Sequence, residues 1–107
     1  GDIINIALDR DNRKVYFGVN GTYGNSSDPA AGSNGIDISS LVTGDTYFLG
    51  VTNDTGASET TAEFNFGAGA TTAISSTNAD ANGHGNFEYA VPSGFYAWNT
   101  KNLAEFG

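Results

Sequence analysis

Residues 4–21 read INIALDRDNRKVYFGVNG, and they carry the clearest structural pattern in the chain. Apolar side chains alternate with polar or small ones over residues 4–8 and again over residues 15–19, as expected for strands with one buried face. A polar run separates the two segments. The second segment ends in Asn20-Gly21, a pair that favours the positive φ angles of a tight turn. The pattern therefore predicts a β-hairpin.

The composition of the whole chain favours one small all-β domain spanning residues 1–107. A chain of 107 residues buries about two-thirds of its unfolded surface, enough for a single modest core. Its bulky apolar residues are mainly Ile, Val, Leu, Phe and Tyr, types that favour pleated surfaces. Its fifteen glycines suit a chain that turns often.

Charge and cysteine content argue against several classes of function. The formal net charge is −8, from twelve acidic and four basic residues. Nucleic acids and anionic membranes bind basic surfaces, so neither is an expected partner. Cysteine is absent, which excludes a disulfide framework and thiolate chemistry. No apolar run approaches the ~20 residues of a membrane-spanning helix.

The remainder of the chain divides into further strand-like segments and two long loops. Strand-like alternation or aromatic content marks residues 46–52, 60–67, 87–89 and 95–98. Residues 36–41 fit a short strand or a turn. Gly, Asn and Ser are frequent in residues 23–35, and residues 67–86 contain few bulky side chains, so we predict both segments to be loops. No helical pattern of convincing length is present.

Several motifs occur in an order that resembles a known family. They are Leu8-Asp9, Phe17-Gly18-Val19-Asn20-Gly21, Asn65-Phe66-Gly67, Pro92-Ser93-Gly94-Phe95 and Thr100-Lys101-Asn102-Leu103. This series is similar to the second half of a SPRY-type, concanavalin A-like antiparallel β-sandwich, in the version found on virion proteins of tailed phages. With the resemblance in mind, we expect Phe17, Phe64 and Phe66 to supply the core between two sheets.

The resemblance also implies that the sandwich is incomplete at its N-terminal side. A complete SPRY sandwich has several strands before the one that starts near Asp2. We therefore expect the chain to be a fragment of a longer one, or to be completed by a neighbouring segment or subunit, because an open apolar face and edge are rarely tolerated. The expected partners are other virion proteins or copies of itself in a homo-oligomer.

The family implies a function in assembly or recognition rather than in catalysis. We expect a tail-fibre, spike or head-decoration module on the virion surface, which contacts partner proteins or a host-surface glycan through loops at one end of the sandwich. The corresponding loops are residues 22–35, 53–59 and 67–86. Candidate ligand-binding residues in them are Tyr23, Asn25, Asp28, Asn53, Asp54, Glu59 and His84.

No residue pattern predicts a cofactor, a metal site or a catalytic residue. His84 is the only histidine, and its position between glycines suggests an exposed loop residue. Without cysteine or a second histidine, a structural zinc site is excluded. The sequence does not exclude a Ca²⁺ site formed by aspartates from several loops. The candidate aspartates are Asp28, Asp37, Asp54 and Asp80.

The alternative function is a carbohydrate-binding accessory module or a glycan-cleaving domain. Glycoside cleavage needs two carboxylates around a sugar cleft, and the candidates by type are Glu59, Glu63 and Glu88. Sugar binding would use exposed aromatic rings. We expect Tyr23 to be the most exposed of these, and we expect Phe95 or Trp98 to pack in the core.

Overall fold

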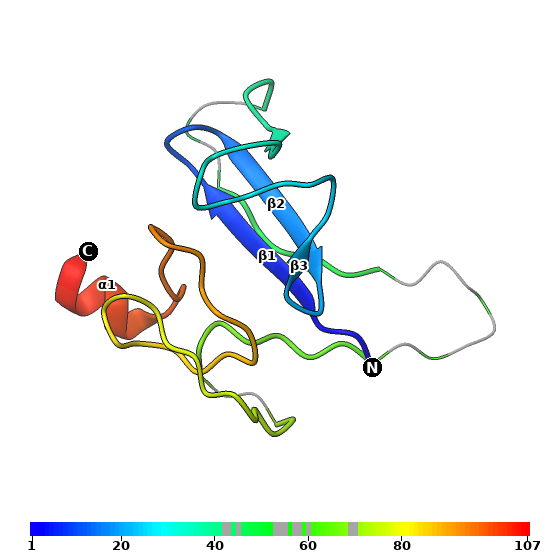
Figure 1. Cartoon of the computed structure of the whole chain (residues 1–107), viewed down its shortest axis with the longest axis vertical. Coiled ribbons are helices and arrows are strands. Elements are labelled where there is room, and N and C mark those ends of the chain that lie inside the picture. The colour runs from blue at the N-terminus through cyan, green and yellow to red at the C-terminus, as the bar shows by residue number, and fades with distance from the viewer. Residues whose placement is uncertain (42–43, 45, 53–55, 57–58, 60, 69–70) are drawn as a thin grey trace.

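The computed structural model is a small antiparallel sheet followed by loops and one short helix (Figure 1). It describes residues 1–41, 44, 46–52, 56, 59, 61–68 and 71–107. The elements in this part of the chain are β1 (Ile4–Asp9), β2 (Lys14–Val19), β3 (Thr22–Tyr23), β4 (Ile36–Asp37) and α1 (Thr100–Phe106). The described structure is therefore consistent with a small all-β fold, as the composition predicts.

The predicted hairpin is confirmed. Strands β1 and β2 are antiparallel, with a register that runs from Ile4 opposite Val19 to Asp9 opposite Lys14. The Asp9 carboxylate closes the connecting turn by accepting hydrogen bonds from the backbone and side-chain nitrogens of Asn12, at 2.9 and 2.8 Å. Both β3 and β4 pair with β2, so β2 is the centre of the sheet.

The Asn20-Gly21 pair forms a tight turn, with φ angles of 50° and 82°. It connects β2 to β3, a strand that lies where the sequence predicted the start of a loop. The turn is fixed by side-chain amides. The Ile3 N–H donates to Oδ1 of Asn20 at 2.9 Å, and the Gly21 N–H donates to Oδ1 of Asn5 at 2.8 Å.

The face of the hairpin that is buried is the opposite of the expected one. Ala7 and Tyr16 face each other across the strands, and Tyr16 is only 1% exposed. Its ring meets Phe95 edge-on, with ring centroids 6.2 Å apart. The ring is also so close to Gly35 that a Cβ there would approach within 2.5 Å. Alternation identifies the two faces of a strand, but distant packing decides which of them is covered.

The apolar face of the hairpin is open. Four of its side chains are between 39% and 57% exposed, namely Ile4, Ile6, Phe17 and Val19. The expectation that Phe17, Phe64 and Phe66 form a buried layer between two sheets is therefore wrong for the described structure. Phe64 and Phe66 stack on each other at 6.2 Å, yet they are 42% and 40% exposed.

The other predicted strands are not formed in the described part of the chain. Residues 46–52, 61–66, 87–89 and 95–98 carry no strand, and only an isolated bridge joins Phe87 to Asn78. Figure 1 shows these segments as plain tubes. A strand needs a partner for its backbone groups, and sequence alternation alone does not supply one.

Helix α1 was not predicted. Its N-cap is Asn99, whose side chain accepts a hydrogen bond from the backbone nitrogen of Asn102 at 2.9 Å. Gly107 ends the helix by donating its N–H to the carbonyl of Leu103. Seven residues are too few to give a clear 3.6-residue period, so the cap was the only usable signal in the sequence.

Candidate functional site

Asp80 is the one buried carboxylate among the described residues. It lies in the turn 80–84 and is 7% exposed. One of its oxygens, Oδ1, accepts from the backbone nitrogens of Asn82 and His84, both at 2.9 Å. The other, Oδ2, accepts from the Ala97 nitrogen at 2.8 Å and from Nδ2 of Asn102 at 2.6 Å. Burial raises the pKa of Asp80, but these hydrogen bonds outweigh it and lower the pKa to about 2.

Asn102 completes this polar cluster. Its Nδ2 also donates to the carbonyl of Ala97 at 2.8 Å, and its Oδ1 accepts from Nδ2 of Asn82 at 2.9 Å. Asn102 is the asparagine of the motif Thr100-Lys101-Asn102-Leu103. The motif was recognised in the sequence, but its contact with Asp80 was not predicted. The cluster joins the loop around Asp80 to the chain that enters α1, so we assign it a structural role.

The described aspartates that the sequence offered as possible Ca²⁺ ligands are not arranged to bind a cation. The oxygens of Asp80 are engaged by N–H donors, while Asp28 and Asp37 each accept from their own local backbone. Within the described ranges, no group of three or more His, Asp or Glu side chains is arranged to hold a metal ion. Asp54 lies outside the described residues.

His84 is not the exposed loop residue that the sequence suggested. Its side chain is 10% exposed, and its Nε2 lies 2.9 Å from Oε2 of Glu105 in α1. The imidazole also lies beside the ring of Phe106, with centroids 6.1 Å apart. His84 therefore connects the loop 67–86 to the terminal helix.

The other candidate ligand residues are not gathered into one site by any described hydrogen bond. Tyr23 is half-buried in β3, and burial raises its pKa. Asn25 is exposed with a φ of 56°, and Asp28 is exposed and accepts from the Ala31 nitrogen at 3.2 Å. Glu59 is exposed. Two further candidates, Asn53 and Asp54, lie outside the described residues.

Two of the glutamates considered for glycan cleavage are held by neighbouring hydroxyl and amide groups. Glu63 accepts from the hydroxyl of Thr72 at 2.6 Å and from the Thr71 nitrogen, and these bonds lower its pKa to about 2. Glu88 accepts from the Ser75 hydroxyl and, at 2.7 Å, from the Ser75 nitrogen, which lowers its pKa. A general acid needs a raised pKa, so neither side chain has the environment of a catalytic acid.

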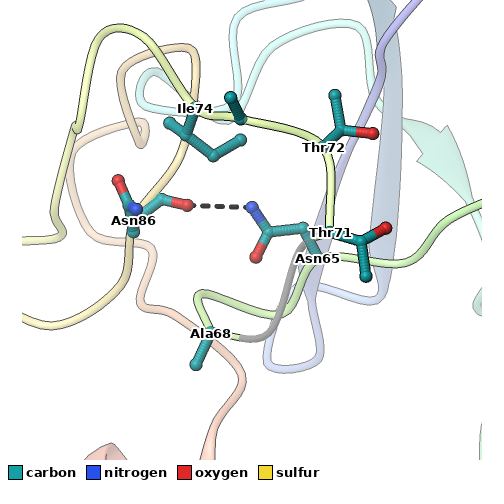
Figure 2. Close-up of a pocket in the computed structure, with 7 residues that line it drawn as sticks. Asn65, Ala68, Thr71, Thr72, Ile74 and Asn86 are labelled. Carbon is teal, nitrogen blue, oxygen red and sulfur yellow. Dashed lines mark hydrogen bonds between the residues drawn. The ribbon is translucent and has the colours of Figure 1, made fainter.

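One small cavity lies beside Glu63, with a volume of about 150 Å³ (Figure 2). Its lining is mostly polar or small and includes Asn65, Thr71, Thr72, Ile74 and Asn86. The Asn65 side chain crosses it and donates from Nδ2 to the carbonyl of Asn86 at 2.8 Å. The cavity is below the usual size of a ligand pocket.

A second cavity, of about 300 Å³, has a different lining. It is bordered by Leu8, Arg10, Gly44, Thr46, Tyr47 and Trp98. The guanidinium carbon of Arg10 lies 5.9 Å from the centre of the Tyr47 ring. Trp98 is 63% exposed, whereas Phe95 packs against the buried Tyr16 ring, so of the two residues considered for the core only Phe95 contributes to it. We call this the Trp98 pocket.

Comparison with known proteins finds no matching family model, no significantly similar curated protein and no significantly similar solved structure. Across the described residues, no helix has the length and apolar content needed to cross a bilayer.

Proposed function

We propose that this chain is a non-enzymatic structural module of a tailed-phage particle, belonging to a tail fibre, a spike or a head-decoration protein. In this proposal it forms part of an SPRY-like sandwich whose second layer comes from a neighbouring polypeptide. The motif series from Leu8-Asp9 to Thr100-Lys101-Asn102-Leu103 supports the family, and the antiparallel sheet is compatible with it.

The observation that carries the proposal is the open apolar face of β1 and β2. Ile4, Ile6, Phe17 and Val19 lie on one side of the hairpin, and none of them is charged. Covering a large aliphatic or aromatic side chain is worth about 1.5–3 kcal/mol, so four half-exposed ones provide several kcal/mol for association. Among the described strands, β1 pairs only with β2, which makes it an edge to which another strand can add.

The carboxylates support a role without catalysis. Glu63 and Glu88 are engaged by local donors that lower their pKa values, and Asp80 is committed to the buried cluster with Asn102. These arrangements stabilise turns and loops.

Sedimentation velocity on the full chain tests whether the apolar face drives association. We expect concentration-dependent oligomers, and we expect the double variant Ile6→Thr/Phe17→Thr to shift the chain to monomer. The matched control is Leu103→Thr, which removes an exposed apolar side chain from α1 instead. A concentration of about 100 µM is high enough to populate even a weak specific dimer. A wild-type chain that stays monomeric at this concentration would contradict the proposal.

The location is tested on the particle itself. Gold-labelled antibodies raised against this chain should bind intact virions of the phage that encodes it, at the tail or on the head surface. Absence of the polypeptide from purified virions by mass spectrometry would remove the virion assignment.

Carbohydrate binding is the second candidate function, and the Trp98 pocket is the observation that favours it. An exposed indole beside a tyrosine and an arginine is a suitable surface for a sugar ring.

A further inference from the structure

We infer that the Trp98 pocket binds a single neutral pyranose ring, such as the terminal residue of an uncharged surface glycan. The inference deepens the carbohydrate-binding candidate, and its test does not require association. Leu8, which borders the pocket, lies on the same side of β1 as Ile6. The pocket combines an apolar platform, a second aromatic wall and hydrogen-bond donors, and its lining comes from three segments of the chain.

The platform is the indole of Trp98. It is 63% exposed, yet its position is fixed from one side, because Phe66 meets it edge-on with centroids 6.0 Å apart and an interplanar angle of 86°. The face of an aromatic ring is electron-rich, and the C–H groups on one side of a pyranose carry slight positive charge, so the two stack favourably. A ring held in place before binding loses little conformational entropy when the ligand arrives.

The second wall is Tyr47, and Arg10 lies over it at 5.9 Å. This cation–π contact positions the guanidinium at the cavity, where its N–H groups can donate to sugar hydroxyls. The hydroxyl of Thr46 adds a group that can both donate and accept. Sugar hydroxyls need such partners to replace the water they lose.

The size and charge of the surroundings limit the ligand. A cavity of about 300 Å³ is at the lower end for ligand pockets and fits one ring better than a chain of them. The whole chain carries a net charge of −8. Acidic sugars and nucleotides are therefore disfavoured, and neutral sugars are not.

The chain has only one tryptophan, so its intrinsic fluorescence reports directly on the pocket. The full chain is titrated with the methyl glycosides of glucose, galactose and N-acetylglucosamine, and with N-acetylneuraminic acid as a charged comparison. We expect a saturable change in emission with at least one neutral glycoside, with a Kd near the millimolar range of a one-ring ligand. Ligand-observed saturation-transfer NMR provides a second readout that does not need the fluorophore.

Variants separate this site from its surroundings. Trp98→Ala should remove the NMR signal, and Arg10→Gln should weaken binding about tenfold, which corresponds to about 1.4 kcal/mol. Tyr96→Ala, which removes another exposed aromatic two residues away, should bind as the wild type does. Far-ultraviolet circular dichroism checks that each variant keeps its fold. Arg10→Gln leaves the aromatic packing in place, so it remains informative if Trp98→Ala unfolds.

The outcomes that overturn the inference are distinct from those that overturn the association proposal. No saturable response to any neutral glycoside, tighter binding of N-acetylneuraminic acid, or full binding by Arg10→Gln would each overturn the sugar site. The double variant Ile6→Thr/Phe17→Thr should remain able to bind sugar. Sugar binding that persists when association is absent would leave the pocket assigned and the association face rejected.

Discussion

At the scale of single residues, Asp80 shows how a charged group becomes part of a core. Four N–H donors surround its carboxylate, and two of them come from residues that are 17 and 22 positions away. The sequence identified Asp80 only as one of several loop aspartates, because its partners, Ala97 and Asn102, cannot be recognised from local spacing. The same limitation applies to His84, whose partner Glu105 lies 21 positions along the chain.

Replacing this carboxylate should be costly. In Asp80→Asn one oxygen acceptor becomes an NH₂ group that faces existing donors, so we expect a loss of about 2–4 kcal/mol in the free energy of unfolding. Urea denaturation measures it. The matched control is Asp28→Asn, since Asp28 is exposed and accepts one bond from Ala31. Equal effects of the two substitutions would contradict the structural role of the cluster.

The same group predicts a pH dependence. The pKa of Asp80 falls from 3.8 to about 2 on folding, so its contribution to stability is complete above about pH 4 and is lost as the pH falls toward 2. Glu63 changes in the same direction. We therefore expect the wild-type unfolding free energy to decrease between about pH 4 and pH 2 more steeply than that of Asp80→Asn, measured by urea denaturation at each pH. Parallel curves would show that Asp80 does not titrate abnormally.

The buried hydroxyl of Tyr16 leads to a second prediction about stability. It is almost fully buried, and none of the described residues forms a hydrogen bond with its hydroxyl. We expect Tyr16→Phe to leave the free energy of unfolding unchanged or to raise it by about 1 kcal/mol, because an unsatisfied buried hydroxyl is removed. Tyr16→Leu, which loses the edge contact with Phe95, should instead destabilise the chain. A thermal melt that shows Tyr16→Phe to be clearly less stable would identify a hidden partner for the hydroxyl.

At the scale of elements, the hairpin was predictable and the rest of the structure only in part. The signals for β1, β2 and the Asn20-Gly21 turn are local, since they depend on alternation and on the φ preferences of two residues. The choice of buried face is not local. It depends on Phe95 and Gly35, which pack against Tyr16. The face that contains Ile6 and Phe17 is more apolar, so the sequence led us to expect that face to be buried.

The candidate site was predictable to a lesser degree for a related reason. The Trp98 pocket joins the end of β1 to Tyr47 and to Trp98, and these segments are far apart in the sequence. The sequence suggested that either Phe95 or Trp98 would be buried, and Trp98 is the one that the structure leaves exposed. The sequence assigned binding to the loops 22–35, 53–59 and 67–86, whereas Thr46 and Tyr47 belong to a segment that it predicted to be a strand and that carries none in the structure.

The turn after β2 offers a test at this scale. Gly21 has a φ of 82°, and a Cβ there would lie 2.6 Å from the ring of Tyr89. Gly32 has a φ of 68° but open space around it, so Gly32→Ala is the matched control. We expect Gly32→Ala to cost about 1–2 kcal/mol for the backbone alone and Gly21→Ala to cost more, measured by chemical denaturation. Equal costs would show that Tyr89 moves away without penalty.

At the scale of the whole molecule, an apolar face and a large negative charge act against each other. Two copies that meet through β1 and β2 bury uncharged side chains, but each brings a net charge of −8. Salt screens the repulsion and leaves the apolar gain largely intact. Self-association should therefore strengthen when NaCl is raised from about 20 mM to about 500 mM, as measured by sedimentation velocity.

A basic or neutral partner would give the opposite salt response or none. Association of the wild-type chain that weakens with salt would therefore indicate that charge pairs, and not the face containing Phe17 and Ile6, hold the copies together. The double variant Ile6→Thr/Phe17→Thr serves again as the control, because it changes the face without changing the net charge.

The Asn20-Gly21 turn also bears on how the molecule ages. Deamidation at an Asn-Gly pair begins when the glycine nitrogen attacks the side-chain carbonyl carbon of the asparagine, which closes a succinimide ring and releases the side-chain nitrogen as ammonia. Here that nitrogen donates its hydrogen to Oδ1 of Asn5, and the Asn20 side-chain amide is held in place by the Ile3 N–H at its oxygen and by the Asp2 carboxylate at its nitrogen. The folded chain should consequently resist isoaspartate formation at this position, whereas the unfolded chain has no such protection.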